Sequence, residues 1–257
     1  MNILFIGDIV GKTGRSAVYA HLPFLKEKYS IDLTIANGEN TAHGKGITEK
    51  LYHELLDQGI DVITLGNHAF SKADILTFIN QSQRLVRPLN LIPTEHGKGY
   101  IDLTIKNKPV RIVNLCGSVF MDNIYESPFV SMQAIVDTSK NKIVIVDLHA
   151  EATSEKIAFA YMFKHICAAV LGTHTHVQTA DERIIDGCAF ISDVGMSGPY
   201  HSIIGRDTQE VLNRFSGVIS KTFTVAEGPA IVSAVMIEID EQTFQAVRIE
   251  RIQIRPE

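Results

Sequence analysis

The chain has 257 residues, of which 45% are hydrophobic and 21% are charged, and its formal net charge is −5. This composition is ordinary for a folded globular protein and argues against extensive disorder. The negative balance argues against a broad basic surface for nucleic acid, but it does not exclude RNA bound at a small local basic patch.

The apolar segments are too short for membrane helices. The longest, such as residues 142–148 and 166–171, fall far below the roughly 18–20 residues that a membrane span needs. The N-terminus has no basic leader, and Asp8 interrupts its first apolar run, so we predict a cytoplasmic location and no membrane partner. The three cysteines have no CxxC spacing and are expected to be buried thiols.

The opening stretch LFIGDIVGKTG, residues 4–14, ends in Gly-Lys-Thr like a nucleotide-binding P-loop. A P-loop needs four residues between its first glycine and this triplet, whereas Gly7 and Gly11 enclose only three. We therefore predict no P-loop, and expect Lys12 and Thr13 either to contact phosphate or to start a helix. The apolar run at residues 3–6 instead brings Asp8 to the end of a strand, where open α/β sheets place ligand-binding groups.

Short β-rich segments then alternate with helical ones, which is typical of parallel strands joined by crossover helices. We expect strands at residues 31–37, 61–66, 111–117, 142–148 and 167–172, and helices at 48–58, from near 71, at 128–138 and at 153–165. After residue 183 the pattern favours antiparallel strands, including the pair 231–240 and 246–254. A phase slip between Ile249 and Ile252 predicts a β-bulge. Because no repeat or linker interrupts the chain, we expect a single domain over residues 1–257.

Polar side chains of the metal-ligand type follow five of the expected strands. They are Asp8, Glu39 with Asn40, Asn67 with His68, His149, and His174 with His176. Since the carboxyl ends of parallel strands lie along one edge of a sheet, these side chains are expected to converge. Residues two apart in extended backbone face the same side, so His174 and His176 can serve one cluster.

Each of these residues also has a role without a metal. Asp8 alone would suit a helix cap, Glu39-Asn40 a polar turn, and Asn67-His68 a turn before a helix. His149 alone would suit a packed core histidine. Together the five strand ends favour a metal site, and mixed oxygen and imidazole ligands suit iron, manganese or zinc. His43 and His201 are further candidates for contact with substrate.

Six blocks of the sequence carry a family resemblance. They are GDIVGKTGR, NGENTAHGKG, LGNHAF, DLHAEATSEK, GTHTHVQTAD and SDVGMSGPY, and they resemble the YmdB branch of the calcineurin-like metallophosphoesterases from the first residues to the last strands. The resemblance implies an α/β/β/α sandwich of two mixed sheets flanked by helices. It also implies a homo-oligomeric phosphodiesterase that hydrolyses 2′,3′- or 3′,5′-cyclic nucleotides to nucleoside monophosphates.

The resemblance also implies a set of metal ligands, with two departures from the wider superfamily. The first block lacks the histidine of the usual Asp-x-His, and Glu39 stands where the bridging residue is usually Asp. The YmdB branch is understood to use Asn40 in place of the lost histidine. The first ion would then be bound by Asp8, Glu39, Asn40 and His176, and the second by Glu39, Asn67, His149 and His174.

This ligand set predicts hydrolysis with two metal ions, iron or manganese first and magnesium or zinc as alternatives. A hydroxide between the ions would attack phosphorus. His68 follows ligand Asn67 without being counted as a ligand, so it is the predicted general acid; its alternative role is to start a helix. A phosphomonoesterase or nuclease with the same metals remains open, as does a nucleotide-sensing regulatory protein that acts through partners.

Overall fold

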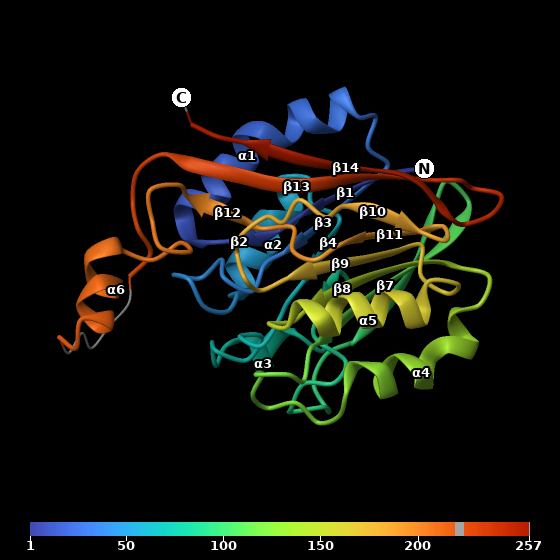
Figure 1. Ribbon diagram of the computed structural model, residues 1–257, viewed down its shortest axis with the longest axis horizontal. Helices are drawn as coiled ribbons and strands as arrows, with labels where there is room; N and C mark the ends of the chain where they lie inside the picture. The colour runs from blue at the N-terminus through green and yellow to red at the C-terminus, as the bar shows by residue number, and fades with distance from the viewer. Residues whose placement is uncertain (219–223, 257) are drawn as a thin grey trace.

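The computed structural model describes residues 1–218 and 224–256, whose strands form two mixed sheets (Figure 1). The first sheet contains β1 (Asn2–Ile6), β2 (Asp8–Ile9), β3 (Leu33–Asn37), β4 (Val62–Thr64), β5 (Leu85–Val86), β12 (Met196–Pro199), β13 (Ala230–Ile239) and β14 (Ala246–Ile254). The second contains β6 (Tyr100–Ile105), β7 (Lys108–Cys116), β8 (Ile143–His149), β9 (Ala169–Thr173), β10 (Arg183–Ile185) and β11 (Cys188–Ile191). The helices are α1 (Gly11–Lys28), α2 (Glu49–Asp57), α3 (Ile75–Phe78), α4 (Pro128–Ser139), α5 (Thr153–Phe163) and α6 (Thr208–Phe215).

Each sheet has parallel strands at its centre. In the first sheet the order is β2-β12-β13-β1-β3-β4-β5, where β1, β3 and β4 pair in parallel and β13 pairs antiparallel with both β1 and β14. In the second the order is β10-β11-β9-β8-β7-β6, and β7, β8, β9 and β11 pair in parallel. The parallel strands of each sheet therefore end along a common edge.

The alternation of side chains along the strands builds three apolar layers. Ile3 and Phe5 of β1 pack between the two sheets, together with Ile145 of β8. Leu4 of β1 faces the opposite way, where α1 contributes Leu22 to the core on the outer face of the first sheet. Successive side chains of a strand point to opposite faces, so a continuous apolar run fills two layers at once.

A third apolar layer lies between the second sheet and the helices α4 and α5, which run along the lower side of Figure 1. It contains Val144 and Val146 of β8, Met132 of α4 and Phe159 of α5. The layer order is thus helix, sheet, sheet, helix, and the predicted α/β/β/α sandwich of two mixed sheets is confirmed. Helix α6 stands apart from both sheets in Figure 1.

Two expected elements differ from the structure. The helix expected from near Ser71 is only α3, because residues 66–74 form tight turns in which Ala69 and Ser71 donate to carbonyls three residues earlier. The β-bulge lies at Val247, where Glu238 pairs with Arg248 and the next residue pairs with Ala246, not between residues 249 and 252. The extra residue follows the hairpin turn and is exposed. Ile249 packs between the sheets and Ile252 packs on the opposite face of β14, so their spacing needs no bulge.

Two expectations about chain-wide features can be compared with the described residues. Within residues 1–218 and 224–256, no helix has the length and apolar character needed to cross a membrane. Cys116, Cys167 and Cys188 are buried free thiols, as expected. Burial raises the pKa of all three thiols, so they are poor nucleophiles at neutral pH.

Candidate metal centre

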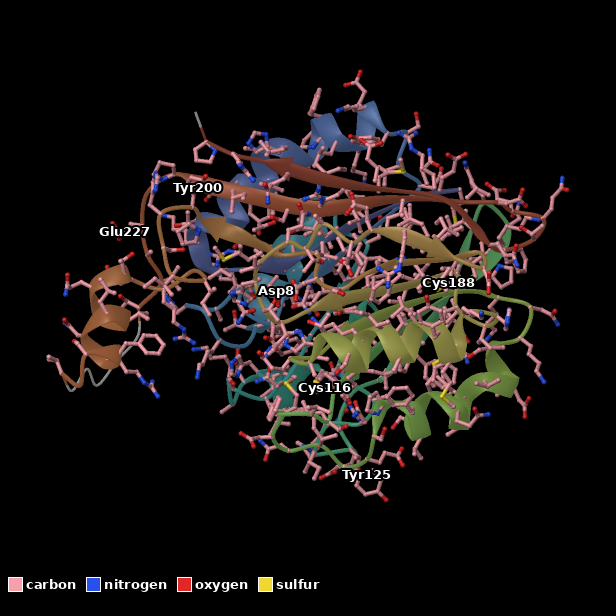
Figure 2. All side chains as sticks on the ribbon, viewed as in Figure 1. Asp8, Cys116, Tyr125, Cys188, Tyr200 and Glu227 are labelled. Atoms are coloured by element: carbon pink, nitrogen blue, oxygen red, sulfur yellow. The ribbon has the colours of Figure 1, made fainter. Side chains whose placement is uncertain are left out.

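The predicted ligands lie where the carboxyl ends of strands from both sheets meet. Those of the first sheet are Asp8 after β1, Glu39 and Asn40 after β3, and Asn67 after β4; those of the second are His149 at the end of β8 and His174 and His176 after β9. In the view of Figure 2, Asp8 lies inside the molecule, between Glu227 on one side and Cys188 on the other. The sequence argument expected one sheet edge, whereas the structure joins the edges of two sheets packed face to face.

Three ligand-type atoms from both sheets converge on Nε2 of the His149 imidazole. Its Nε2 lies 3.1 Å from Glu39 Oε1, 3.0 Å from Asn67 Oδ1 and 3.0 Å from His174 Nδ1. One ring nitrogen offers a single hydrogen or a single lone pair, so it cannot form three hydrogen bonds. Neighbouring ligands of an octahedral ion with bonds of about 2.1 Å are themselves about 3.0 Å apart. Glu39, His149 and His174 thus form a candidate metal-binding group.

The outer ring nitrogen of each predicted histidine ligand has its own partner. The pairs are His149 Nδ1 with Thr173 Oγ1 at 2.9 Å, His174 Nε2 with Glu151 Oε2 at 3.2 Å, and His176 Nδ1 with the carbonyl of Ile204 at 2.9 Å. A nitrogen that donates outward leaves the lone pair of the other nitrogen facing the site, as metal ligands require. All three rings are therefore oriented for binding an ion.

The partner of His149 is itself fixed by a buried carboxylate. Thr173 Oγ1 donates to Asp147 Oδ1 at 2.7 Å, so its lone pair is left to accept from His149. Asp147 also accepts from Thr64 and, at 3.0 Å, from Asn37 Nδ2. Burial raises the pKa of Asp147 to about 6. The sequence analysis gave Asp147 no role, although a carboxylate inside the apolar run of β8, two residues before a predicted ligand, is a visible signal.

Two buried side-chain oxygens near the other predicted ligands lack partners among the described residues. Asp8 Oδ2 accepts from the N–H of His174 at 3.2 Å, while Oδ1 has no hydrogen bond and lies 3.9 Å from His176 Nε2. Asn40 donates to the carbonyl of Gly44 at 3.1 Å, and its own Oδ1 is also unpartnered. Leaving a buried acceptor unpaired is costly, and a cation would satisfy both oxygens.

The pKa values of Glu39 and His149 are shifted because their opposite charges lie close together. Burial disfavours charge on Glu39, but the positive charge of His149 and its hydrogen bond outweigh burial and lower the pKa of Glu39 to about 2. Burial likewise lowers the pKa of His149, yet Glu39, Asp8 and Asp147 outweigh it and raise that pKa to about 9. A proton on His149 therefore occupies the position of positive charge that a metal ion would take.

The remaining groups follow from burial. Burial and the positive charge of His149 lower the pKa of His174 to about 3, so this ring is neutral and keeps a lone pair. Burial also raises the pKa of Asp8, against the attraction of His176 and His149. Both pKa shifts arise mainly because burial disfavours the charged form, and shifted pKa values of this kind are common at functional sites.

Gly66 lies against Glu39 and His149 at the centre of the site. A Cβ at this position would lie 2.4 Å from both Glu39 Oε2 and His149 Nε2, which is closer than real Cβ atoms approach other atoms. Only glycine lets the side chains of Glu39 and His149 pack this closely against the backbone at residue 66.

A cavity of about 250 Å³ opens over the cluster. Its lining includes Glu39, Asn40, His43, His68, His174 and His176. A larger cavity of about 890 Å³ lies beside it, lined in part by Lys12 and Thr13 at the start of α1, and both cavities share His43, Thr224 and Val225. His201 lines neither cavity; its exposed ring packs edge-on against Tyr200, with centroids 5.0 Å apart. The structure thus brings His43, Lys12 and Thr13 near the site but not His201.

His68 is attached directly to the candidate centre. Its backbone N–H donates to Glu39 Oε2 at 3.0 Å, and its side chain lines the smaller cavity. Burial lowers its pKa, and the charges of Lys45, His149 and Arg206 add to this effect against the opposing charge of Glu39. A lower pKa makes the protonated ring a stronger acid, while fewer rings carry the proton at neutral pH.

The backbone around the last two ligands is not extended. His174 has φ 102° and His176 has φ 67°, and β9 ends at Thr173. The argument that extended backbone points both rings to the same side is therefore wrong, although the structure does bring both rings to the site. A turn with two residues of positive φ does so instead.

Comparison with known proteins identifies the family of this chain. The family model described as YmdB-like protein matches residues 4–252. The chain belongs to the YmdB-like family. The Bacillus subtilis protein named 2′,3′-cyclic-nucleotide 2′-phosphodiesterase is 46% identical over 257 residues, covering 99% of this chain and 97% of that protein.

Solved structures show how far the likeness to this family extends. The crystal structure of a Mycoplasma pneumoniae protein, described as a novel phosphatase, has a TM-score of 0.94 at 38% identity, covering 99% of this chain and 93% of that one. A 5′-nucleotidase from Candida albicans has a TM-score of 0.56 at 13% identity, covering 99% of this chain and 51% of that one, and shares the fold alone. The names of the closer relatives confirm the prediction of an enzyme of the phosphodiesterase and phosphatase class.

Proposed function

We propose that this YmdB-like chain is a phosphodiesterase with two metal ions that opens 2′,3′-cyclic nucleotides to nucleoside monophosphates. The observation that carries the proposal is the convergence of Glu39, Asn67, His149 and His174 around one point, with the unpartnered oxygens of Asp8 and Asn40 beside it. The substrate class is taken from the name of the Bacillus subtilis relative at 46% identity.

We assign the residues to the two predicted sets. Asp8, Asn40 and His176 would hold one ion and Asn67, His149 and His174 the other, with Glu39 shared. Iron or manganese suits these mixed oxygen and nitrogen donors, and zinc or magnesium is the alternative. When bound, the ions would polarise the phosphate and lower the pKa of the attacking water.

The side chains would then carry out the rest of the reaction. Hydrolysis adds the oxygen of water to phosphorus and breaks one P–O bond of the ring, and the released ribose oxygen must gain a proton. His68 is the proposed donor, because its ring lines the cavity above the cluster and its backbone is tied to Glu39. Because the side chains of the cluster are buried and held in place, a phosphate bound there would stay at a fixed distance from the His68 ring.

The larger cavity is the proposed binding place for the nucleoside part of the substrate. It adjoins the smaller cavity through His43, Thr224 and Val225. With the phosphate of the substrate at the cluster, the attached sugar and base can therefore extend into the larger cavity. Its volume of about 890 Å³ falls in the range typical of small-molecule sites. The wall near the start of α1 supplies the cation Lys12 and the hydroxyl of Thr13.

Replacing Lys12 tests this placement. We expect Lys12→Ala to raise KM for cyclic nucleotides several-fold while kcat stays within about twofold. The reason is that a contact made equally in the substrate complex and in the transition state affects binding and not the chemical step. Lys28→Ala, at the other end of α1, is the matched control and should leave both constants unchanged. Calorimetry with ATP and magnesium should detect no tight binding to wild type, since the chain lacks a P-loop. Tight ATP binding that Lys12→Ala abolishes would contradict the proposed role.

A phosphomonoesterase is the second candidate, because the Mycoplasma pneumoniae relative is described as a phosphatase. A substrate panel separates the candidates: 2′,3′- and 3′,5′-cyclic nucleotides, a generic aryl diester and nucleoside monophosphates, each with and without added manganese. We expect metal-dependent turnover of the 2′,3′-cyclic nucleotide above all others. Turnover of monophosphates alone would favour the phosphatase, and no hydrolysis of any substrate would favour a nucleotide-sensing protein.

A further inference from the structure

The turn that carries His174 and His176 is held in an unfavourable backbone conformation. Both residues have positive φ, at 102° and 67°, which side chains larger than glycine rarely adopt. Such residues persist only where the surrounding structure fixes them. The contacts that fix this turn therefore decide whether both imidazoles face the site. Asp8 Oδ2 accepts from the N–H of His174 at 3.2 Å, and the N–H of Met196 donates to the carbonyl of His176 at 3.1 Å.

Two buried charged residues supply further contacts, to the residues before and between the two histidines. Asp193 Oδ2 accepts from the N–H of Thr175 at 3.0 Å and from its hydroxyl at 2.8 Å, so it binds the residue between the two histidines. Lys156 Nζ donates to the carbonyl of Thr173 at 2.9 Å, just before the turn. Lys156 and Asp193 are joined to each other at 3.0 Å.

The pair is built into the interior. The side chain of Lys156 is 2% exposed and that of Asp193 is 1% exposed. Gly172 leaves room for the lysine, because a Cβ there would lie 2.9 Å from Lys156 Cδ and 1.8 Å from the carbonyl oxygen of Ser192. Asp193 Oδ1 in turn accepts from the N–H of Gly195 at 2.8 Å. Burying two charges gains little stability as such, so a positional role accounts better for the arrangement.

We propose that Lys156 and Asp193 are positioning residues that hold the Thr173–His176 turn so that both imidazoles bind metal. This inference rests on the proposed metal site. Neither residue touches the cluster; each acts through the backbone and through Thr175. Without the pair, the turn would relax towards negative φ and move the rings away, so the site would have to be reorganised each time metal binds.

Thr175→Val tests the contact without changing any charge. Valine keeps the shape and the N–H but removes the hydroxyl that donates to Asp193. We expect manganese affinity, measured by competition with a chelator, to fall about 10-fold. This is at the lower end of the loss of metal affinity seen when a residue that hydrogen-bonds to a metal ligand is replaced. The unfolding temperature of the metal-free variant should stay at the wild-type value, which separates positioning from general stability.

A second variant removes the pair itself. Asp193→Asn alone would leave the charge of Lys156 buried without an opposing carboxylate. It is therefore combined with Lys156→Met, because methionine fills a similar volume and carries no charge. We expect this double variant to bind manganese about 10- to 100-fold more weakly than wild type.

Asp102→Asn is the matched control. Asp102 pairs with buried Arg111 at 2.7 Å, and Arg111 lies at the opposite end of β7 from Cys116, the residue that pairs with His149. This variant should keep wild-type manganese affinity. Wild-type affinity in both Thr175→Val and the double variant would overturn the inference while leaving the proposed function intact, whereas a wild-type protein that binds no manganese would overturn both.

Discussion

Glu39→Gln is expected to cause the largest loss of any single ligand substitution. Glu39 is the only residue assigned to both proposed ions, and its carboxylate would screen their mutual repulsion. An amide is neutral and cannot do this equally well. We expect metal content and hydrolysis of 2′,3′-cyclic nucleotide to fall together, by more than the 10- to 100-fold that follows loss of an outer partner.

Glu151→Gln provides the scale for this comparison. Glu151 contacts His174 Nε2 at 3.2 Å and is assigned to no ion. Its substitution should therefore lower metal affinity or activity by only about 10- to 100-fold. Metal content is measured by elemental analysis beside kcat in both variants. A Glu39→Gln enzyme that keeps two ions and a near-normal rate would show that the bridging role is misassigned.

His68→Ala is expected to keep the metals and the fold but to slow hydrolysis of cyclic nucleotide by about 10²- to 10⁴-fold, the usual scale of lost general acid catalysis. The side chain lines the cavity, and only its backbone contacts Glu39. A leaving group such as p-nitrophenolate needs little protonation. The loss should therefore be much smaller on an activated aryl diester.

That difference between substrates is the decisive readout, with His53→Ala as control because His53 lies exposed on α2. Equal slowing of both substrates by His68→Ala would assign His68 to substrate binding. Loss of a metal ion from the variant would make it a ligand instead. The His53 variant should match wild type on both substrates.

Much of the fold could be predicted because the strands are apolar on both faces. Runs such as residues 142–148 read as buried parallel strands, and the helices around them follow from their spacing. The same runs also mark where each strand ends, so polar residues just beyond them were visible as candidate ligands. Asp8, Glu39, Asn67 and His149 were found in this way.

The sequence pattern could not show how the two sheets face each other. Periodicity places Asp147 and His149 on one face of β8, but only packing shows that this face meets Asn37 and Thr64 of the other sheet. For the same reason the turn after β9 was misjudged. The turn has positive φ at His174 and His176 and contacts Asp193, which lies close to it only in the folded chain.

The remaining misses have local causes. The β-bulge at Val247 was misplaced because both faces of β14 are apolar, so Ile249 and Ile252 pack in different layers without any slip in register. His201 was a candidate for substrate contact from its place in GPYHSIIG, and the structure places it exposed against Tyr200 and outside the lining of both cavities. Residue type alone does not reveal which histidines share a cavity.

We propose that residues from both sheets together bind two ions, and the number of bound ions can be counted. The purified chain, stripped with chelator and reloaded with manganese, would be analysed for metal per mole of protein. We expect two equivalents for wild type and a return of hydrolysis of 2′,3′-cyclic nucleotide as the second equivalent binds. One equivalent or fewer under saturating manganese would contradict it.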